Sequence, residues 1–83
     1  MKFFAEIDIM PLKALLDPQG KAVTSSMNNI GYVSVQNVRI GKHITLEIDA
    51  DDEGHARQKV EDACKKILSN PIMESYEFTL SPL

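Results

Sequence analysis

The chain has 83 residues, of which 43% are hydrophobic and 25% charged, and its formal net charge is −3. This length suits one domain, over residues 1–83, and so small a domain buries only about 60–65% of the surface that its unfolded chain exposes. The core is therefore expected to be thin, and association with another chain would help to stabilise it. The acidic balance argues against nucleic-acid binding, which needs a basic face to neutralise phosphates.

The single cysteine, Cys64, cannot form an internal disulfide, which fits a reducing compartment. Glu6 and Asp8 interrupt the apolar residues near the N-terminus, so this segment does not resemble a signal peptide. No stretch approaches 18 apolar residues, and a membrane span is not expected. The sequence therefore predicts a cytoplasmic protein with neither nucleic acid nor membrane as a partner.

The first half of the chain predicts a strand, a helix and a second strand. Residues 2–10 alternate with period two, which is typical of a strand. Asp17 and Pro18 suit the start of a helix, because Asp can accept hydrogen bonds from free N–H groups and Pro fits the first helical position. Gly31 suits its end. Its narrow apolar stripe, Val23, Met27 and Ile30, is expected to pack against the sheet. Residues 32–40 then predict a strand whose alternation slips at Gln36-Asn37, which suggests a bulge.

The second half repeats this order. Gly41-Lys42 predicts a tight turn and residues 43–50 alternate cleanly as a strand. Asp51-Asp52-Glu53 opens a second helix, where acidic residues suit the helix dipole, and Asn70-Pro71 ends it. The apolar stripe of that helix comprises Ala56, Val60, Ala63, Cys64, Ile67 and Leu68. A last strand follows, with Tyr76, Phe78 and Leu80 on one face.

The predicted fold class is therefore α+β, with the order β-α-β-β-α-β. This order is that of a ferredoxin-like sandwich, with a four-stranded antiparallel sheet and two helices on one face. The face without helices would carry Phe4, Glu6, Asp8, Met10, Thr45, Glu47, Glu77 and Thr79. Such a mixed face often packs on a second copy of the same chain.

The sequence offers no clear catalytic or metal-binding pattern. Cys64 lies in an apolar helical stripe and is expected to be a buried structural cysteine. His43 and His55 lack the spacing of metal ligands and are expected at the surface. The acidic run from Asp49 to Glu53 lacks the pattern of a calcium loop and is explained by a helix N-terminus. Neither Gly20-Lys21 nor Gly41-Lys42 forms a phosphate-binding loop.

Two other functions of this strand order remain as alternatives. An RNA-binding module needs aromatic side chains on its central strands, and residues 43–50 carry none. A small-molecule regulatory module of the ACT type has the same order of elements, with its ligand site at a dimer interface.

Three segments resemble motifs of the PurS family. Residues 15–23 read LLDPQGKAV and contain the family's LDPQGKAV segment. Residues 38–42 read VRIGK and match its VRxGK pattern, and residues 68–76 read LSNPIMESY and match LxNPxxExY. The motifs occur in the family's order and spacing, and the resemblance covers essentially the whole chain.

PurS proteins are the small subunits of phosphoribosylformylglycinamidine synthase in purine biosynthesis. The resemblance implies a non-catalytic chain that joins a synthetase subunit (PurL) to a glutaminase subunit (PurQ) and supports ammonia transfer between them. It implies no cofactor in this chain, because ATP and Mg²⁺ are used by the large subunit. It also implies a homodimer or a dimer of dimers.

Eight motif residues are candidates for contacts with partners or for turns and caps. Asp17, Pro18 and Gly20 would set the entry to the first helix. Arg39, Gly41 and Lys42 would form an exposed turn, and Asn70 and Pro71 would set the exit into the last strand. A purely structural role is at least as well supported for each.

Overall fold

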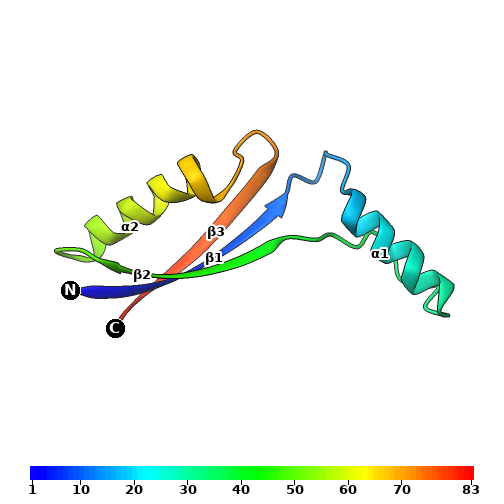
Figure 1. Ribbon diagram of the computed structural model, residues 1–83, viewed down its shortest axis with the longest axis horizontal. Coiled ribbons are helices and arrows are strands. Elements are labelled where there is room, and N and C mark those ends of the chain that lie inside the picture. The colour runs from blue at the N-terminus through cyan, green and yellow to red at the C-terminus, as the bar shows by residue number, and fades with distance from the viewer.

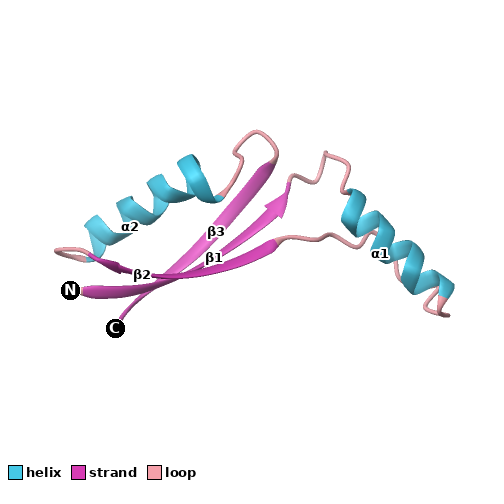
Figure 2. Ribbon diagram, in the orientation of Figure 1, coloured by secondary structure: helices cyan, strands magenta, loops and turns pink.

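The computed structural model describes residues 1–83 and contains three strands and two α-helices. The elements in chain order are β1 (Lys2–Pro11), α1 (Pro18–Asn29), β2 (Lys42–Asp49), α2 (Glu53–Ala63), the π-helical turn η1 (Cys64–Leu68) and β3 (Glu74–Pro82). The strands form one antiparallel sheet in the order β2-β1-β3, and Figure 2 shows α2 above it. The predicted α+β class is confirmed.

The core lies between α2 and the central strand β1. Ala5, Ile7 and Ile9 point from β1 toward α2 and pack against Val60 and Cys64, and all five are fully buried. Half-buried side chains surround this cluster, namely Ile44, Leu46, Ile48, Leu68, Tyr76, Phe78 and Leu80. Those on β2 and β3 lie on one face of each strand, as their period-two spacing predicted, because successive strand residues point to opposite faces. Cys64 is buried as predicted, and burial raises the pKa of its thiol.

The sheet face opposite α2 is open. The register places Asp8 of β1 between His43 of β2 and Glu77 of β3, and it places Glu6 between Thr45 and Thr79. These residues are exposed, whereas Phe4 on the same face is half-buried. The predicted composition of this face is confirmed.

The prediction of a fourth strand is wrong. Residues 32–40 form no strand, because N–H groups within them donate to side chains of Thr24 in α1 and of Asp17 before it, and not to β2. The N–H of Val38 donates to the hydroxyl of Thr24, and the N–H of Ile40 donates to the carboxylate of Asp17. Asn37 has a positive φ of 56°, so the irregularity expected near residue 37 exists, but it is not a bulge within a strand.

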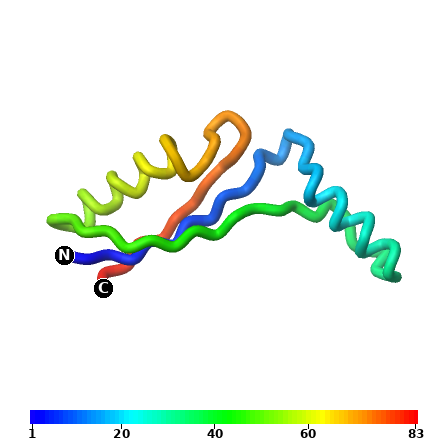
Figure 3. Tube along the Cα trace, in the orientation of Figure 1, coloured from blue at the N-terminus to red at the C-terminus, as the bar shows by residue number.

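The prediction that both helices cover one sheet face is also wrong. Figure 1 and Figure 3 show α1 projecting beyond the end of the sheet, with residues 30–41 returning beside it. Of the stripe expected to face the sheet, Ile30 is 73% exposed. The chain spans 52 × 26 × 14 Å and has a radius of gyration of 16.4 Å, whereas a compact domain of this length has a radius of gyration of about 12 Å. We call α1 with residues 30–41 the arm, and the sheet with α2 and η1 the body.

The second helix ends in a π-helical turn that changes its buried face. The N–H and the hydroxyl of Ser69 both donate to the carbonyl of Cys64, five residues earlier. A π-turn holds more residues than an α-turn, so it rotates the following side chains out of phase. Leu68 still packs on the core, but Ile67, expected in the apolar stripe, is 81% exposed. Neither helix has the length and apolar character that crossing a membrane requires.

Candidate functional site

The three motif segments, far apart in the sequence, meet where the arm leaves the body. We call this region the junction and define it as residues 11–20, 38–42 and 69–74. The N–H of Leu12 donates to the carbonyl of Met73 at 2.9 Å, which ties the first segment to the third. All three contribute to one hollow of about 340 Å³, whose lining includes Pro18, Ile40 and Asn70.

Asp17 links the start of α1 to the returning chain. As predicted, it caps α1, and its carboxylate accepts from the N–H of Gly20 at 3.1 Å. Its other oxygen accepts from the N–H of Ile40 at 2.8 Å. The hydrogen bond from Ile40, followed by that from Gly20, lowers the pKa of Asp17 because both stabilise the charged form. Pro18 occupies the first turn, as its fixed φ favours.

Gly20 lies where the returning chain touches α1. A Cβ at this position would stand 2.0 Å from the carbonyl oxygen of Val38, so no other residue fits without moving the arm. One turn later, the Thr24 hydroxyl donates to the carbonyl of Gly20 and accepts from the N–H of Val38. The glycine therefore allows a helix and an extended segment to approach closely.

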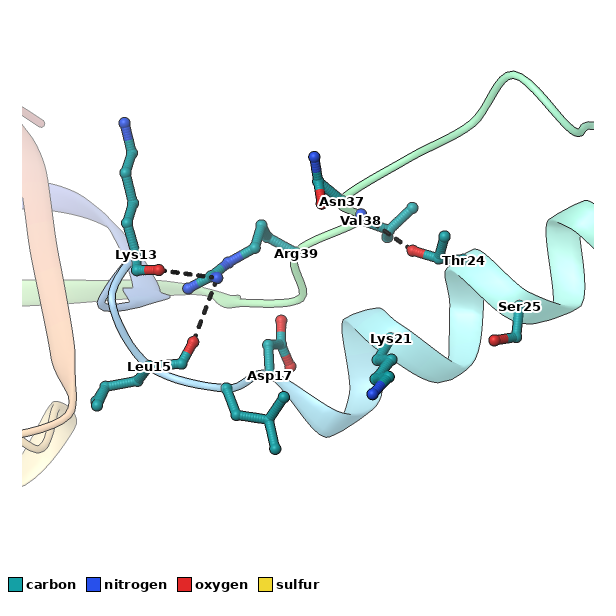
Figure 4. Close-up of a pocket in the computed structure, with 10 residues that line it drawn as sticks. Lys13, Leu15, Asp17, Lys21, Thr24, Ser25, Asn37, Val38 and Arg39 are labelled. Carbon is teal, nitrogen blue, oxygen red and sulfur yellow. Dashed lines mark hydrogen bonds between the residues drawn. The ribbon is translucent and has the colours of Figure 1, made fainter.

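Arg39 organises the loop between β1 and α1. Its guanidinium donates to the carbonyls of Pro11 at 3.0 Å and Leu12 at 2.7 Å. Longer contacts of 3.5 and 3.4 Å reach the carbonyls of Lys13 and Leu15, and Figure 4 shows both. The planar fork of Arg suits such divergent acceptors. The prediction that Arg39 lies in an exposed turn is wrong, because it is half-buried against this loop.

Gly41 and Lys42 do not form the predicted turn. The chain runs straight into β2, where Lys42 pairs with Ile9. A Cβ on Gly41 would lie 2.2 Å from the carbonyl oxygen of Ile9, so close approach to β1 explains this glycine. The ammonium of Lys42 lies 3.9 Å from the carboxylate of Glu74.

Asn70 sets the turn into β3, as predicted. Its side-chain oxygen accepts from the N–H of Ile72 at 3.1 Å, and its own N–H donates to the carboxylate of Glu74 at 2.7 Å. Its carbonyl accepts from the N–H groups of Met73 and Glu74. Pro71 is exposed within this turn.

A second hollow lies on the arm side of the junction, and sequence reasoning missed most of it. This cavity of about 700 Å³ includes Lys13, Lys21 and Arg39 in its lining (Figure 4). Lys21 lies within the first motif and Thr24 follows Gly20 by one turn, so both had a signal in the sequence. Lys13 had none, because its loop carries no periodic pattern.

Both histidines lie at the surface, as predicted. Nδ1 of His43 lies 2.6 Å from the carboxylate of Asp8 on the open sheet face, and this hydrogen bond raises the pKa of His43. His55 pairs with Asp52, which caps α2 and so accounts for part of the acidic run. No group of three or more His, Cys, Asp or Glu side chains is placed to hold a metal ion. The hydrogen bonds of the junction fix its three segments relative to one another.

The chain matches the family model described as PurS, phosphoribosylformylglycinamidine (FGAM) synthase, over residues 4–82. It is 41% identical over 70 residues to the phosphoribosylformylglycinamidine synthase subunit PurS of Synechocystis, covering 84% of this chain and 70% of that protein. It is 38% identical over 66 residues to the PurS subunit of Bacillus subtilis, covering 80% of this chain and 77% of that protein.

Solved structures agree with these sequence matches. The structure of Bacillus subtilis PurS superposes with a TM-score of 0.88 at 31% identity, covering 96% of this chain and 99% of that one. A chain in the structure of PurLQS from Thermotoga maritima gives a TM-score of 0.87 at 30% identity, covering 98% of this chain and 99% of that one. The projecting arm and the three-stranded sheet therefore belong to a fold with experimental counterparts.

Proposed function

The chain belongs to the PurS family and is a small subunit of phosphoribosylformylglycinamidine synthase, a ligase (EC 6.3.5.3), and we propose that it joins the synthetase and glutaminase subunits of that enzyme. In this role the 83 residues act as one domain in the cytoplasm. The glutaminase subunit releases ammonia from glutamine. The synthetase subunit activates formylglycinamide ribonucleotide with ATP and Mg²⁺, and this chain supports the passage of ammonia between them.

One observation carries this proposal, namely the match to a chain of the PurLQS structure over nearly the full length of both. The name PurLQS indicates an assembly of PurS with PurL and PurQ. Because that match includes the arm as well as the body, the similarity in shape supports the same kind of assembly here.

The structure supports a docking role through what it leaves uncovered. Ten of 83 residues are buried, so most side chains are available to other chains. Large apolar side chains are exposed at the junction and on the arm, including Leu16, Ile30, Tyr32 and Val33. Contiguous apolar patches mark interaction sites, and in this proposal these side chains contribute to such a patch. A homodimer or dimer of dimers would use part of this surface, and the subunits PurL and PurQ would use the rest.

The eight motif residues act in this proposal mainly by fixing the shape of the surface. Asp17 and Gly20 hold α1 against the returning segment, and Arg39 holds that segment to the loop after β1. Lys42, Asn70 and the exposed Pro71 lie at the rim, where a partner can reach them.

Reconstitution with purified PurL and PurQ tests the proposal. Glutamine-driven formation of the amidine product is expected only when all three proteins are present, and a high concentration of ammonia is expected to reduce the need for this chain. Glutamine-driven activity that is unchanged when this chain is omitted would refute the proposal.

The ACT-type alternative is not favoured by any of these comparisons, since the relatives and structures described above are PurS subunits or PurLQS. A thermal-shift screen with amino acids and nucleotides separates the two functions, and the bridging role predicts no shift for the isolated chain.

A further inference from the structure

The larger hollow of the junction gathers positive charge in an acidic chain. We call it the cationic cavity; it has a volume of about 700 Å³ and lies between α1, the loop before it and the returning segment. Lys13 comes from the loop, Lys21 from α1 and Arg39 from the returning segment (Figure 4). Three cations from three segments thus line one cavity, although the chain as a whole carries a net charge of −3.

These three charges have no carboxylate partners within the chain. Neither lysine, nor Arg39, lies within 4.0 Å of a carboxylate oxygen, whereas Lys42, Arg57 and Lys65 each form an ion pair. Asp17 is the one acidic residue of the lining, and its negative charge, which interacts with that of Arg39, offsets one of the three positive charges. The cavity therefore keeps an excess of positive charge, which favours an anionic occupant.

The remaining lining resembles a protein interface more than a metabolite pocket. Small-molecule pockets are lined predominantly by hydrophobic and aromatic side chains, whereas three of the ten lining residues here are hydrophobic. Ser25 and Asn37 add polar groups, and Leu16, which is 76% exposed, adds apolar surface. A polypeptide segment with carboxylates and an apolar side chain would satisfy both kinds of surface.

We propose that the cationic cavity is a docking site for an acidic segment of a partner subunit of the same enzyme, whose carboxylates pair with Lys13 and Lys21. This inference rests on the proposed bridging function and adds the chemistry of one contact. Arg39 contributes charge but remains committed to the loop carbonyls, so the two lysines supply the mobile cations. Complementary charge of this kind sets partner orientation and accelerates association.

Charge reversal tests the docking site in the complete assembly. The double variant Lys13→Glu/Lys21→Glu is compared with Lys66→Glu, which reverses an exposed lysine of η1 that forms no ion pair. Binding to PurL and PurQ is measured by isothermal titration calorimetry at low and high salt. The double variant is expected to bind at least about tenfold more weakly than the wild type, and the control within about twofold. The salt dependence of the double variant should also be smaller.

Two further comparisons keep the outcomes distinct. A double variant that binds as tightly as Lys66→Glu overturns the docking site and leaves the bridging function intact. If the wild-type chain itself neither binds nor supports glutamine-driven activity, both proposals fall. The neutral variant Lys13→Gln/Lys21→Gln, with folding checked by circular dichroism, should show an intermediate loss of affinity.

A crosslinking experiment identifies the occupant directly. Ser25 lines the cavity and forms no hydrogen bond through its side chain, so Ser25→Cys can carry a benzophenone without disturbing the junction. After irradiation of the assembly, mass spectrometry is expected to find a partner peptide rich in Asp and Glu. Crosslinks to a second copy of this chain would overturn the proposal. Saturable binding of inorganic phosphate that the double variant loses, with unchanged partner affinity, would also overturn it.

Discussion

The body and the arm are held by different forces. In the body, α2 covers one sheet face, and Ala5, Ile7 and Ile9 of β1 are fully buried against it. In the arm, Gly20 is the one buried residue, and α1 is held to the returning segment through Asp17 and Thr24. Apolar burial stabilises the body, whereas hydrogen bonds from backbone N–H groups to the side chains of Asp17 and Thr24 hold the two parts of the arm together. Such a segment opens locally at lower free energy than a packed core, which suits a surface that meets other chains.

Truncation of a core side chain should have the largest effect. Ile7→Ala removes a fully buried side chain, and it is expected to cost about 2–5 kcal/mol of unfolding free energy. The matched arm variant, Ile30→Ala, removes a side chain that is 73% exposed and should cost less than about 0.5 kcal/mol. Urea denaturation of the isolated chain measures both. Equal losses of unfolding free energy would show that the arm is covered, for example by self-association, and would contradict the stated difference between body and arm.

Adding a methyl group where α1 touches the returning segment should have the next largest effect on stability. Gly20→Ala places a Cβ in the space of the Val38 carbonyl, and the strain is expected to cost about 1–3 kcal/mol. Hydrogen exchange should quicken at the amides of Val38 and Ile40 but not at those of β1. Gln19→Ala alters the neighbouring exposed side chain and serves as the control. Faster exchange across β1 would mean that arm and body unfold together.

Loss of the guanidinium fork should loosen only the loop that precedes α1. Arg39→Lys keeps the charge but cannot reach the carbonyls of Pro11 and Leu12 together, and the expected cost is about 1–2 kcal/mol. Loosening of the loop should appear in NMR as faster hydrogen exchange at the amides of residues 12–17. Arg57→Lys on α2 retains an exposed ion pair and should change little. Full stability of Arg39→Lys would indicate that the loop is held by the Leu12–Met73 hydrogen bond.

The smallest effects on stability are expected from changes of pH, which should act on the arm and on the body in opposite directions. The pKa of Asp17 is lowered by the hydrogen bonds from Ile40 and Gly20, so its contribution is present above the ordinary value of 3.8 and is lost as pH falls through the lowered pKa. The pKa of His43 is raised by the hydrogen bond to Asp8, so its contribution is present below 6.5 and is lost as pH rises through the raised pKa. Acid should therefore loosen the arm, and alkali should weaken the β1–β2 pairing.

NMR chemical shifts of the Ile40 amide and the His43 ring, followed across pH, check these two directions. Asp17→Asn should abolish the acid transition at Ile40, and Asp8→Asn should bring the His43 titration back toward its ordinary range. A transition at Ile40 that survives in Asp17→Asn would assign the acid sensitivity to another carboxylate.

Sequence patterns alone correctly predicted the strands β1, β2 and β3, the helix α2 with its acidic start and the cap at Asp17. These features follow from local rules, since side-chain periodicity and free N–H groups act over a few residues. The motifs likewise identified the family without any knowledge of the fold. They did not reveal that the three segments would lie side by side.

The conformation of residues 32–40 and the position of α1 depended on tertiary contacts that local sequence patterns do not reveal. The alternation of residues 32–40 suits a strand, but strand formation needs a partner edge, and their N–H groups find Thr24 and Asp17 instead. That choice depends on the close approach permitted by Gly20, a contact between residues 18 positions apart. The cationic cavity arises for the same reason, because Lys13, Lys21 and Arg39 meet only once the arm has folded back on itself.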